Sequence, residues 1–361
     1  MSDPTSSTFA DQLDRRTAEG ALYERLPGQS VRCVACGHRC LIRDGRRGIC
    51  KVRRNEGGTL LVPRNYVAAL QCDPVEKKPF NHVLPGSRAL TFGMLGCDYH
   101  CGFCHNWVTS QSLRDSDAGT APIDVTAEQL VGYAGRCDAR LVVSSYNEPL
   151  ITSEWAVEVF GVARERGLLT GFVSNGNATP EALDFVRPHA DCYKIDLKTM
   201  SDRNYRRLGG VLQNVLDSIR MVHERGFWLE VLTLVIPGFS DDEGQLRAAA
   251  EYVASVSPDI PWHVTAFHED YKFYGMGNTT AEMLVRACEV GREAGLRYVY
   301  AGNLPGRVGR WEHTHCPGCD TPVIERTGYR ILANRLRADG RCPSCATVLP
   351  GIWGTPSTTR P

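Results

Sequence analysis

The sequence lacks a surplus of charge and any long apolar run, and its first residues lack the apolar stretch typical of a secretory signal. Lysine plus arginine and aspartate plus glutamate both number 41 among the 361 residues, and this balance argues against nucleic acid or another polyanion as a partner. No run of roughly eighteen apolar residues is present, so we expect no membrane span. The first residues, MSDPTSSTFADQLDRR, contain no apolar segment of the kind found in secretory signals, so we expect a cytoplasmic protein.

Cysteine, by contrast, is abundant, with 15 residues. Cytoplasmic thiols stay reduced, so disulfides are the less favoured use, and grouped thiols indicate metal sites. Three groups stand out: Cys33, Cys36, Cys40 and Cys50; Cys97, Cys101 and Cys104; and Cys316, Cys319, Cys342 and Cys345. The other four stand alone and are expected to be small buried hydrophobic side chains: Cys72, Cys137, Cys192 and Cys288.

Changes in composition divide the chain into four parts. The polar residues 1–30 predict a flexible N-terminus, residues 31–87 a Cys-rich module, and residues 88–303 a core that alternates between strand-like and helix-like stretches. Residues 304–361 break this alternation with a zinc-ribbon-like C-terminal module and a tail. The length and the 42% hydrophobic content suit one large α/β domain with small appendages.

The alternating part predicts parallel strands joined by right-handed helical crossovers. We therefore expect an α/β fold, a partial (β/α) barrel of parallel strands, with its active site at the C-terminal strand ends. The expected strands are Ala89–Leu95, Leu141–Tyr146, Thr170–Ser174, Cys192–Leu197, Trp228–Ile236, His263–Phe267 and Arg297–Ala301. The expected helices are Ala127–Arg136, Glu154–Arg166, Pro180–Val186, Val211–Arg225, Asp242–Val256 and Thr280–Ala294.

The central cysteine group follows the first expected strand in the segment TFGMLGCDYHCGFCHNW. Its C-x3-C-x2-C spacing offers three thiolates to a [4Fe–4S] cluster, which usually has four, so one iron would stay open. An open iron can chelate the amino and carboxylate groups of S-adenosylmethionine (SAM), whose sulfonium C–S bond then breaks on one-electron reduction. The alternatives for Cys97, Cys101 and Cys104 are a structural zinc knuckle and thiols grouped by chance.

This spacing, with an aromatic residue before the last cysteine, resembles the signature of the radical SAM superfamily. The resemblance implies that the three cysteines bind the cluster, that Phe103 lies near the adenine, and that SAM yields methionine and a 5′-deoxyadenosyl radical. The radical would abstract hydrogen from a small-molecule or protein substrate. An external one-electron donor of the flavodoxin or ferredoxin type is implied as well.

Later strand ends also resemble the SAM pocket of this family. SSYNEP stands where relatives often have Gly-Gly-Glu-Pro, whose carboxylate receives the SAM ammonium, and SNGN and YKIDLK resemble pocket segments of glycyl-radical activating enzymes. The cofactor-binding candidates are therefore Phe103, Asn147, Glu148, Ser174, Asn175, Asp196, Lys198 and, by position after the sixth strand, His268. Each candidate also has a structural alternative. Glu148 could serve the dipole at a helix N-terminus, and Ser174-Asn175 could belong to an ordinary Asn-Gly turn. Asp196 and Lys198 could form an ion pair at a strand end, and His268 could cap a strand.

The complete set of motifs resembles the AmmeMemoRadiSam system radical SAM enzymes over about residues 31–354. It comprises C-x2-C-x3-C-x9-C, CDPVEKKPFNHVLPGS, the central triplet, SSYNEP, YKIDLK and the terminal CPGC, CPSC and LPGIW segments. That group is related to pyruvate formate-lyase activating enzymes, so an oxidoreductase that places a glycyl radical on a partner protein is one alternative function. The other is a non-catalytic zinc-binding interaction protein.

The two outer cysteine groups have four members each. CPGC and CPSC enclose 22 residues with an expected β-hairpin and resemble a zinc ribbon or rubredoxin knuckle, for which a closed tetrahedral thiolate site favours zinc over iron. For the N-terminal group zinc is the first choice, an auxiliary [4Fe–4S] cluster the second, and unliganded thiols the third. The members of that group are Cys33, Cys36, Cys40 and Cys50.

Overall fold

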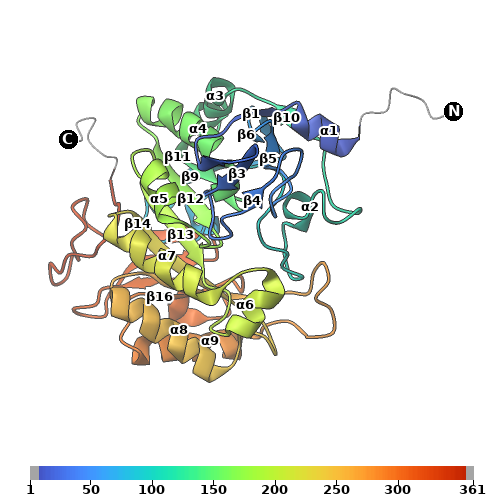
Figure 1. Ribbon diagram of the computed structural model, residues 1–361. Coiled ribbons are helices and arrows are strands. Elements are labelled where there is room, and N and C mark those ends of the chain that lie inside the picture. The colour runs from blue at the N-terminus through green and yellow to red at the C-terminus, as the bar shows by residue number, and fades with distance from the viewer. Residues whose placement is uncertain (1–7, 355–361) are drawn as a thin grey trace.

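The computed structural model describes residues 8–354, and its largest element is an eight-stranded sheet (Figure 1). The strand order is β16-β15-β14-β13-β12-β11-β9-β8. Neighbouring strands are parallel except for β8 and β9, which are antiparallel. The strands are β8 (Ala69–Pro74), β9 (Arg88–Gly93), β11 (Ala139–Ser144), β12 (Leu169–Ser174), β13 (Cys192–Asp196), β14 (Trp228–Val235), β15 (Trp262–Ala266) and β16 (Val299–Gly302).

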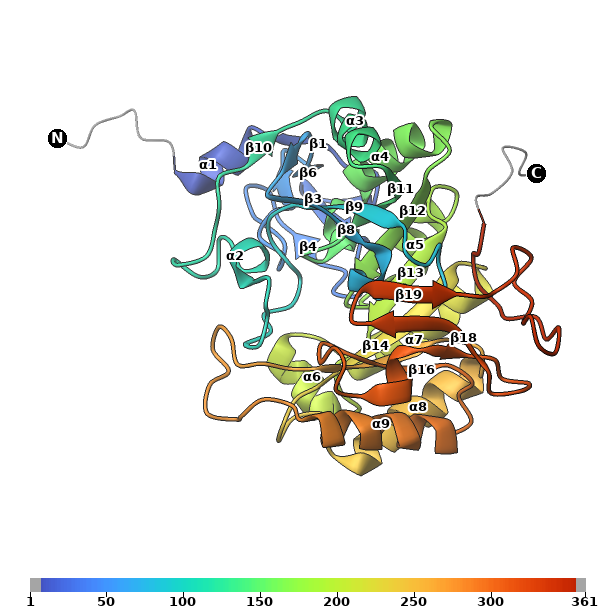
Figure 2. The same ribbon diagram turned by 180° about the vertical axis from the view of Figure 1, so that it is seen from behind.

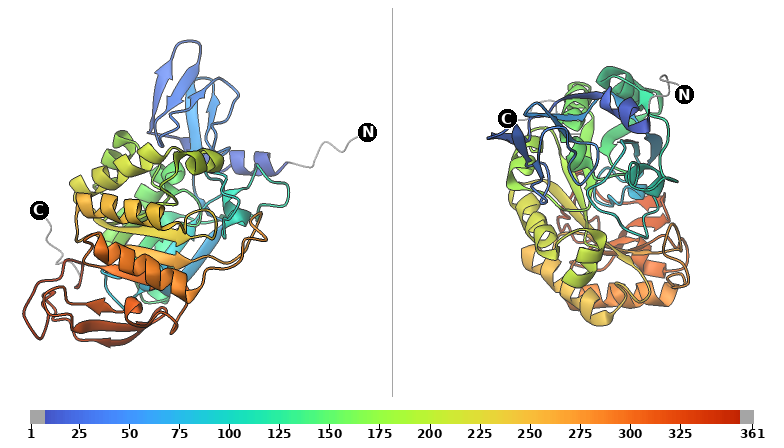
Figure 3. Two further views of the ribbon diagram at one scale, coloured as in Figure 1. Left: turned by 90° about the horizontal axis from the view of Figure 1, so that it is seen from below. Right: turned by 45° about the vertical axis from the view of Figure 1, so that its right-hand side comes forward.

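Helices between the strands cover the outer face of this curved sheet (Figure 3). The strands that they cover are almost wholly buried, as expected for parallel strands packed on both faces. The sheet ends at β8 and β16 without pairing them, so the predicted partial barrel is confirmed. The helices are α3 (Ala127–Arg136), α4 (Ser153–Glu165), α5 (Pro180–Val186), α6 (Asp202–Leu208), α7 (Leu212–Glu224), α8 (Glu243–Val256) and α9 (Ala281–Glu293).

The N-terminal part is more ordered than its polar composition predicted. Within the expected flexible terminus, the structure has α1 (Phe9–Asp14), β1 (Thr17–Glu19) and β2 (Tyr23–Leu26), and only residues 1–7 lie outside the described part. Thr8 caps α1 through a capping box, and β1 pairs with a strand far along the chain, which composition alone does not reveal. Two small antiparallel sheets result, β1-β6-β5 and β2-β3-β4, completed by β3 (Ser30–Cys33), β4 (Leu41–Ile42), β5 (Arg54–Glu56) and β6 (Thr59–Pro63).

Two of the lone cysteines differ from expectation. Cys72 on β8 and Cys137 at the end of α3 form a disulfide, and both are half-buried rather than buried. Strand β8 was not predicted, so the contact between its outer edge and α3 could not be foreseen. The other two, Cys192 and Cys288, are buried as expected.

The C-terminal module packs against the end of the barrel that carries β16. Its strands β17 (Thr314–His315), β18 (Pro322–Thr327) and β19 (Arg330–Asn334) form an antiparallel sheet, and Figure 2 shows the hairpin β18–β19 beside β16. Arg326 on β18 is fully buried and donates to the carbonyl of Asn81, which fixes the hairpin to the segment before β9. Among residues 8–354 we find no helix with the length and apolarity that a membrane crossing requires.

His82 joins three parts of the chain in the buried layer beneath this module. Its ring lies 2.8 Å from the carbonyl oxygen of Pro350 through Nδ1 and 2.6 Å from the hydroxyl of Tyr300 on β16 through Nε2. The ring also stacks on Trp228 and contacts Trp353. Burial lowers the pKa of His82 to about 4, so the ring is neutral in the folded protein at neutral pH.

We predict that His82 makes the fold sensitive to acid. Between pH 6.5 and pH 4 the unfolded chain binds a proton at this residue that the folded chain does not, so the unfolding free energy falls by up to about 3 kcal/mol as the pH drops through this range. Urea titrations at several pH values should show a smaller pH dependence for His82→Asn than for the wild type. Exposed His223→Asn on α7 is the control, and an unchanged slope in His82→Asn would contradict the prediction.

Candidate functional site

The three central cysteines lie in the loop that leads from the end of β9 to the short helix α2 (Trp107–Ser110). Cys101 is buried, and Cys97 and Cys104 are half-buried. Their sulfur atoms do not converge to within 4.8 Å of one another, a separation too wide for one mononuclear ion. The Ser110 hydroxyl lies 3.2 Å from the Cys104 sulfur, in place to donate a hydrogen bond to a thiolate there.

A cavity of about 100 Å³ at this loop is lined by all three cysteines. Strands β9, β11, β12 and β13 end beside it, because parallel neighbouring strands bring their carboxyl ends to one edge of the sheet. Six of the eight predicted cofactor-binding residues line the same cavity: Asn147, Glu148, Ser174, Asn175, Asp196 and Lys198.

Glu148 is the buried carboxylate of this cavity. Its Oε1 accepts hydrogen bonds from the Leu150 amide at 3.0 Å and the Ser174 hydroxyl at 2.8 Å, and its Oε2 accepts one from the Asn175 amide at 2.7 Å. A carboxylate has about four acceptor positions, so one on Oε2 is left for a ligand. Burial, followed by the charge of Asp98, raises the pKa of Glu148 to about 8, and a cation bound there would restore its charge.

Asp98 is a central residue that the sequence analysis missed. It is fully buried and accepts hydrogen bonds from the side-chain amides of Asn175 at 2.7 Å and Asn177 at 2.8 Å. It thereby ties the cysteine loop to the loop after β12, which holds the main-chain donor to Glu148. An acidic residue directly after Cys97 and an Asn-Gly-Asn segment were visible in the sequence, but nothing there pairs them.

Asp196 lies between two lysines at the end of β13. Its carboxylate pairs with Lys194 on the same strand and with Lys198, whose Nζ lies 3.1 Å away. Burial alone would raise the pKa of Asp196, but the two ammonium groups lower it to about 2. The strand-end ion pair given above as the alternative for Asp196 and Lys198 is thus present, with Lys194 as an additional member, while both residues also line the cavity.

A second cavity, of about 370 Å³, adjoins the first, since Tyr146, Asp196 and Lys198 line both. Phe103 lines this larger chamber and packs edge-on against Phe239. Tyr146, which stands where relatives often have glycine, takes a left-handed φ of 69°, and its hydroxyl lies 3.2 Å from Lys78 Nζ. The tyrosine therefore adopts the backbone conformation of a glycine while adding a ring to the chamber wall.

His268 does not line either cavity. It follows β15 as predicted, but it is exposed and its ring stacks on that of His105 with centroids 4.0 Å apart. His268 lines a neighbouring, more open pocket together with Asn303 and Tyr329, which also line the larger chamber, and we do not include it in the proposed site at the cysteines.

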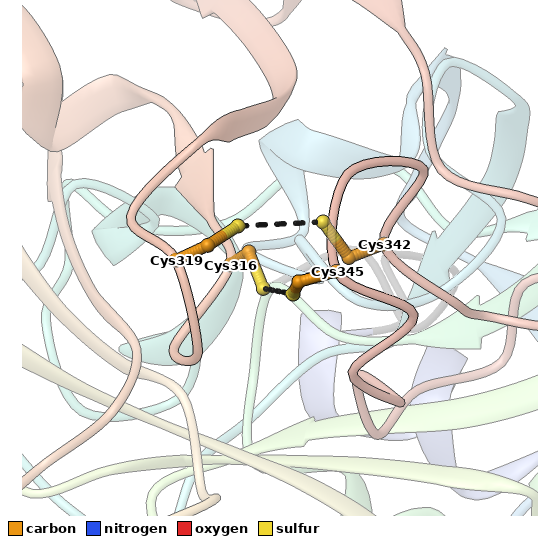
Figure 4. A group of neighbouring side chains, drawn as sticks. All are labelled: Cys316, Cys319, Cys342 and Cys345. Atoms are coloured by element: carbon orange, nitrogen blue, oxygen red, sulfur yellow. Dashed lines mark hydrogen bonds between the residues drawn. The ribbon is translucent and has the colours of Figure 1, made fainter.

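The C-terminal cysteines converge on one point (Figure 4). The sulfurs of Cys316 and Cys345 are 3.5 Å apart, those of Cys319 and Cys342 are 3.7 Å apart, and all four lie within 4.8 Å of one another. A tetrahedral zinc ion with Zn–S bonds of about 2.3 Å requires sulfur separations of about 3.8 Å. The group therefore fits a single thiolate-bound ion.

The N-terminal cysteines are arranged differently. Cys33 ends β3, Cys36 and Cys40 lie in the β3–β4 connection, and Cys50 follows β4. All are buried except the half-buried Cys40. Although this part of the chain is fully described, no three of the four sulfurs lie mutually within 4.8 Å.

Comparison with known proteins identifies relatives over most of the chain. The family model described as the Radical SAM superfamily matches residues 92–250. An uncharacterized protein of Methanocaldococcus jannaschii, MJ0808, is 33% identical over 330 residues, which cover 91% of this chain and 97% of that protein. A pyruvate formate-lyase-activating enzyme of Staphylococcus aureus is 24% identical over 197 residues, 51% of this chain and 76% of the enzyme.

Solved structures show more distant likeness. A domain of a pyruvate-formate lyase-activating enzyme from Bacteroides vulgatus has a TM-score of 0.41 at 22% identity and covers 45% of this chain and 98% of that one. Methylornithine synthase has a TM-score of 0.43 at 15% identity and covers 63% of this chain and 66% of that one.

We predict one zinc ion per chain at the C-terminal cysteines. Replacing the exposed pair by Cys319→Ala and Cys345→Ala should remove this zinc without changing the iron content, and should lower the melting temperature, because a structural zinc site contributes folding free energy. Elemental analysis of wild type and variant would test this. Loss of one iron in place of zinc would instead assign a rubredoxin-type iron site.

Proposed function

Because the chain belongs to the radical SAM superfamily, we propose that it is an enzyme that cleaves SAM reductively at Cys97, Cys101 and Cys104. The observation that carries the proposal is the shared cavity, in which three thiols meet the buried Glu148 and the Ser174-Asn175 turn. When bound, a [4Fe–4S] cluster and SAM supply an electron and a 5′-deoxyadenosyl radical that takes hydrogen from a substrate.

The residues around the thiols suit this ligand pair. Three thiol ligands leave room for a chelating ligand, and the remaining acceptor position of Glu148 Oε2 suits the ammonium group of SAM. Asn147 supports the loop by accepting a hydrogen bond from the Met94 amide at 3.3 Å. Asp98 accepts a hydrogen bond from the side chain of Asn175, and this contact helps to hold the backbone amide of Asn175 in place to donate to Glu148.

The larger chamber is the proposed substrate site. It adjoins the SAM cavity at Tyr146, Asp196 and Lys198, so a substrate within it would lie next to the reacting end of SAM. Its wall carries charges of both signs, with Lys78 and Lys198 on one side of the balance and Glu76 and Asp196 on the other, and such a lining suits a substrate with strongly polar groups. The chamber size favours a small molecule or a short chain segment over a folded domain.

We also propose a type of enzyme, a compartment and an electron donor. The set of motifs supports an enzyme of the AmmeMemoRadiSam system type. We place it in the cytoplasm, with a flavodoxin- or ferredoxin-type electron donor. The converging C-terminal cysteines would hold zinc. The similarity to pyruvate formate-lyase-activating enzymes supports a glycyl-radical activase as the second candidate. An electron paramagnetic resonance (EPR) doublet on a co-incubated partner protein would distinguish the activase from an enzyme with a small substrate.

The test is SAM cleavage by anaerobically reconstituted protein given dithionite. We expect methionine and 5′-deoxyadenosine from the wild type and neither product from Cys101→Ala. Glu148→Gln removes a charge-assisted hydrogen bond and should weaken SAM binding roughly 10- to 100-fold. Glu158→Gln on the exposed side of α4 is the matched control and should bind SAM like the wild type. Product formation by Cys101→Ala would refute the proposed function.

A further inference from the structure

The N-terminal cysteine group packs directly against the loop that completes the SAM cavity. The amide of Gly37, one residue after Cys36, donates to the carbonyl of Asn177 at 2.9 Å. A side chain at Gly37 would collide with the buried Asn177 amide oxygen, so only glycine permits this approach. The Thr179 hydroxyl donates to the carbonyl of Val34, which fixes the same two loops a second time.

His38 and Asp98 form the boundary between the two cysteine groups. Nε2 of His38 lies 4.0 Å from Asp98 Oδ2, and it has no hydrogen-bond partner among the described residues. Asp98 directly follows Cys97 of the central triplet, and the Cys97 sulfur lies 3.7 Å from Asp98 Oδ1. His38, which stands between Cys36 and Cys40 in the sequence, and Asp98 thus form a layer where the two cysteine loops meet.

The sulfur spacing distinguishes two kinds of metal site within this chain. The C-terminal four sulfurs lie within 4.8 Å of one another, as a single zinc ion requires. The central triplet, which the family assigns to a cubane cluster, lacks such convergence, and the N-terminal four lack it as well. The N-terminal group therefore resembles the central triplet in not converging on one point as a single ion requires, and its four cysteines match the number of thiolates that usually hold a cubane.

A buried cation faces this group. Arg53 is almost fully buried, donates from Nη1 to the Cys33 sulfur at 3.3 Å and from Nε to the carbonyl of Ile151 at 2.8 Å, and pairs with Glu154. A hydrogen bond and a positive charge on a ligand sulfur stabilise the reduced, more negative state of an iron–sulfur cluster. Ile151 and Glu154 lie in the segment just after Glu148, so Arg53 also ties this group to the SAM cavity.

The outer side of the group is basic and partly apolar. Arg43, Arg46 and Lys51 are exposed, and no carboxylate among residues 8–354 pairs with them, whereas neighbouring Arg47 pairs with Asp14. Leu41 and Ile49, each next to a cysteine of the group, are 57% and 39% exposed. A basic rim around exposed apolar side chains is complementary to a small acidic protein.

We propose that Cys33, Cys36, Cys40 and Cys50 hold a second iron–sulfur cluster, and that this cluster is the entry point for electrons from a small acidic one-electron carrier protein docked at Arg43, Arg46 and Lys51. One electron leaves the reduced carrier, reduces the second cluster and passes across the His38–Asp98 layer to the central site. The carrier is oxidised by one electron, and the central site is reduced by one. The relay rests on the proposed function, but the presence of the second cluster does not.

Iron content tests the second cluster without disturbing its ligands. The triple variant Cys97→Ala, Cys101→Ala, Cys104→Ala removes the central site, and after anaerobic reconstitution it should retain about four irons and four sulfides per chain, against about eight of each in the wild type. Dithionite should produce an EPR signal from this variant. A variant that holds zinc or no metal at the N-terminal group, with no iron, would overturn the proposal while leaving SAM cleavage by the wild type untouched.

A second variant removes cysteines of the N-terminal group and leaves the central cysteines in place, so that the two iron counts check each other against misfolding. Cys36→Ala together with Cys40→Ala leaves two thiols at the N-terminal group, fewer than the three that are proposed to hold the central cluster, and should reduce the iron content of an otherwise wild-type chain from about eight to about four. Cys288→Ala, at a buried lone cysteine on α9, is the matched control and should keep all the iron. Unchanged iron in the Cys36→Ala, Cys40→Ala double variant, with no loss of EPR signal, would contradict the assignment.

The docking surface is tested by charge reversal. Arg43→Glu, Arg46→Glu and Lys51→Glu together should lower the ratio of SAM cleavage driven by reduced flavodoxin to that driven by dithionite at least tenfold. In the wild type, added salt should lower the same ratio, because it screens the attraction between exposed charges. An unchanged ratio in the variant would overturn the docking site, and the iron counts would still decide on the cluster.

Discussion

The buried carboxylate of Asp98 is the interaction on which the arrangement of the site depends. A carboxylate without solvent must be fully hydrogen-bonded, and here the two amides of Asn175 and Asn177 serve it. Because Asp98 belongs to the cysteine loop and the two asparagines to the loop after β12, satisfying one charge fixes two loops relative to each other. The contact of Asn177 with Gly37 then sets the N-terminal module against both.

The parallel strand order of the barrel brings the other residues of the site together. Parallel strands place the ends of β9, β11, β12 and β13 along one edge, so residues far apart in sequence meet there without specific pairing information. The sheet stays open between β8 and β16, and the hairpin β18–β19 reaches across the chamber, where Arg326 contacts Asn81 and approaches Glu76 at 3.9 Å. The open barrel and the hairpin that covers it form a chamber whose walls come from the barrel core, the segment before β9 and the C-terminal module.

The alternation of apolar strands and amphipathic helices was enough to predict the parallel core, because each strand and crossover helix is a local pattern. Strand β8 was missed because, within residues 8–354, it pairs with β9 alone and in the antiparallel direction, and because its burial pattern is mixed. The same pattern led to six candidates that line one cavity, but it did not reveal that His268 stacks on His105 away from that cavity, because the direction of a loop after its strand is not periodic. Asp98 and Asn177 lie 79 positions apart, and no local pattern reports such a pair.

The walls of the chamber come from two kinds of segment, one inside and one outside the residues that match the superfamily model. Asp196 and Lys198 belong to the barrel core that the superfamily shares, and they line both the SAM cavity and the chamber. Lys78 comes from the segment before β9 and Tyr329 from the turn of the C-terminal hairpin, and both lie outside the matched residues 92–250. On the proposed function, the core would carry the radical chemistry, and the appended segments would select the substrate that can approach it.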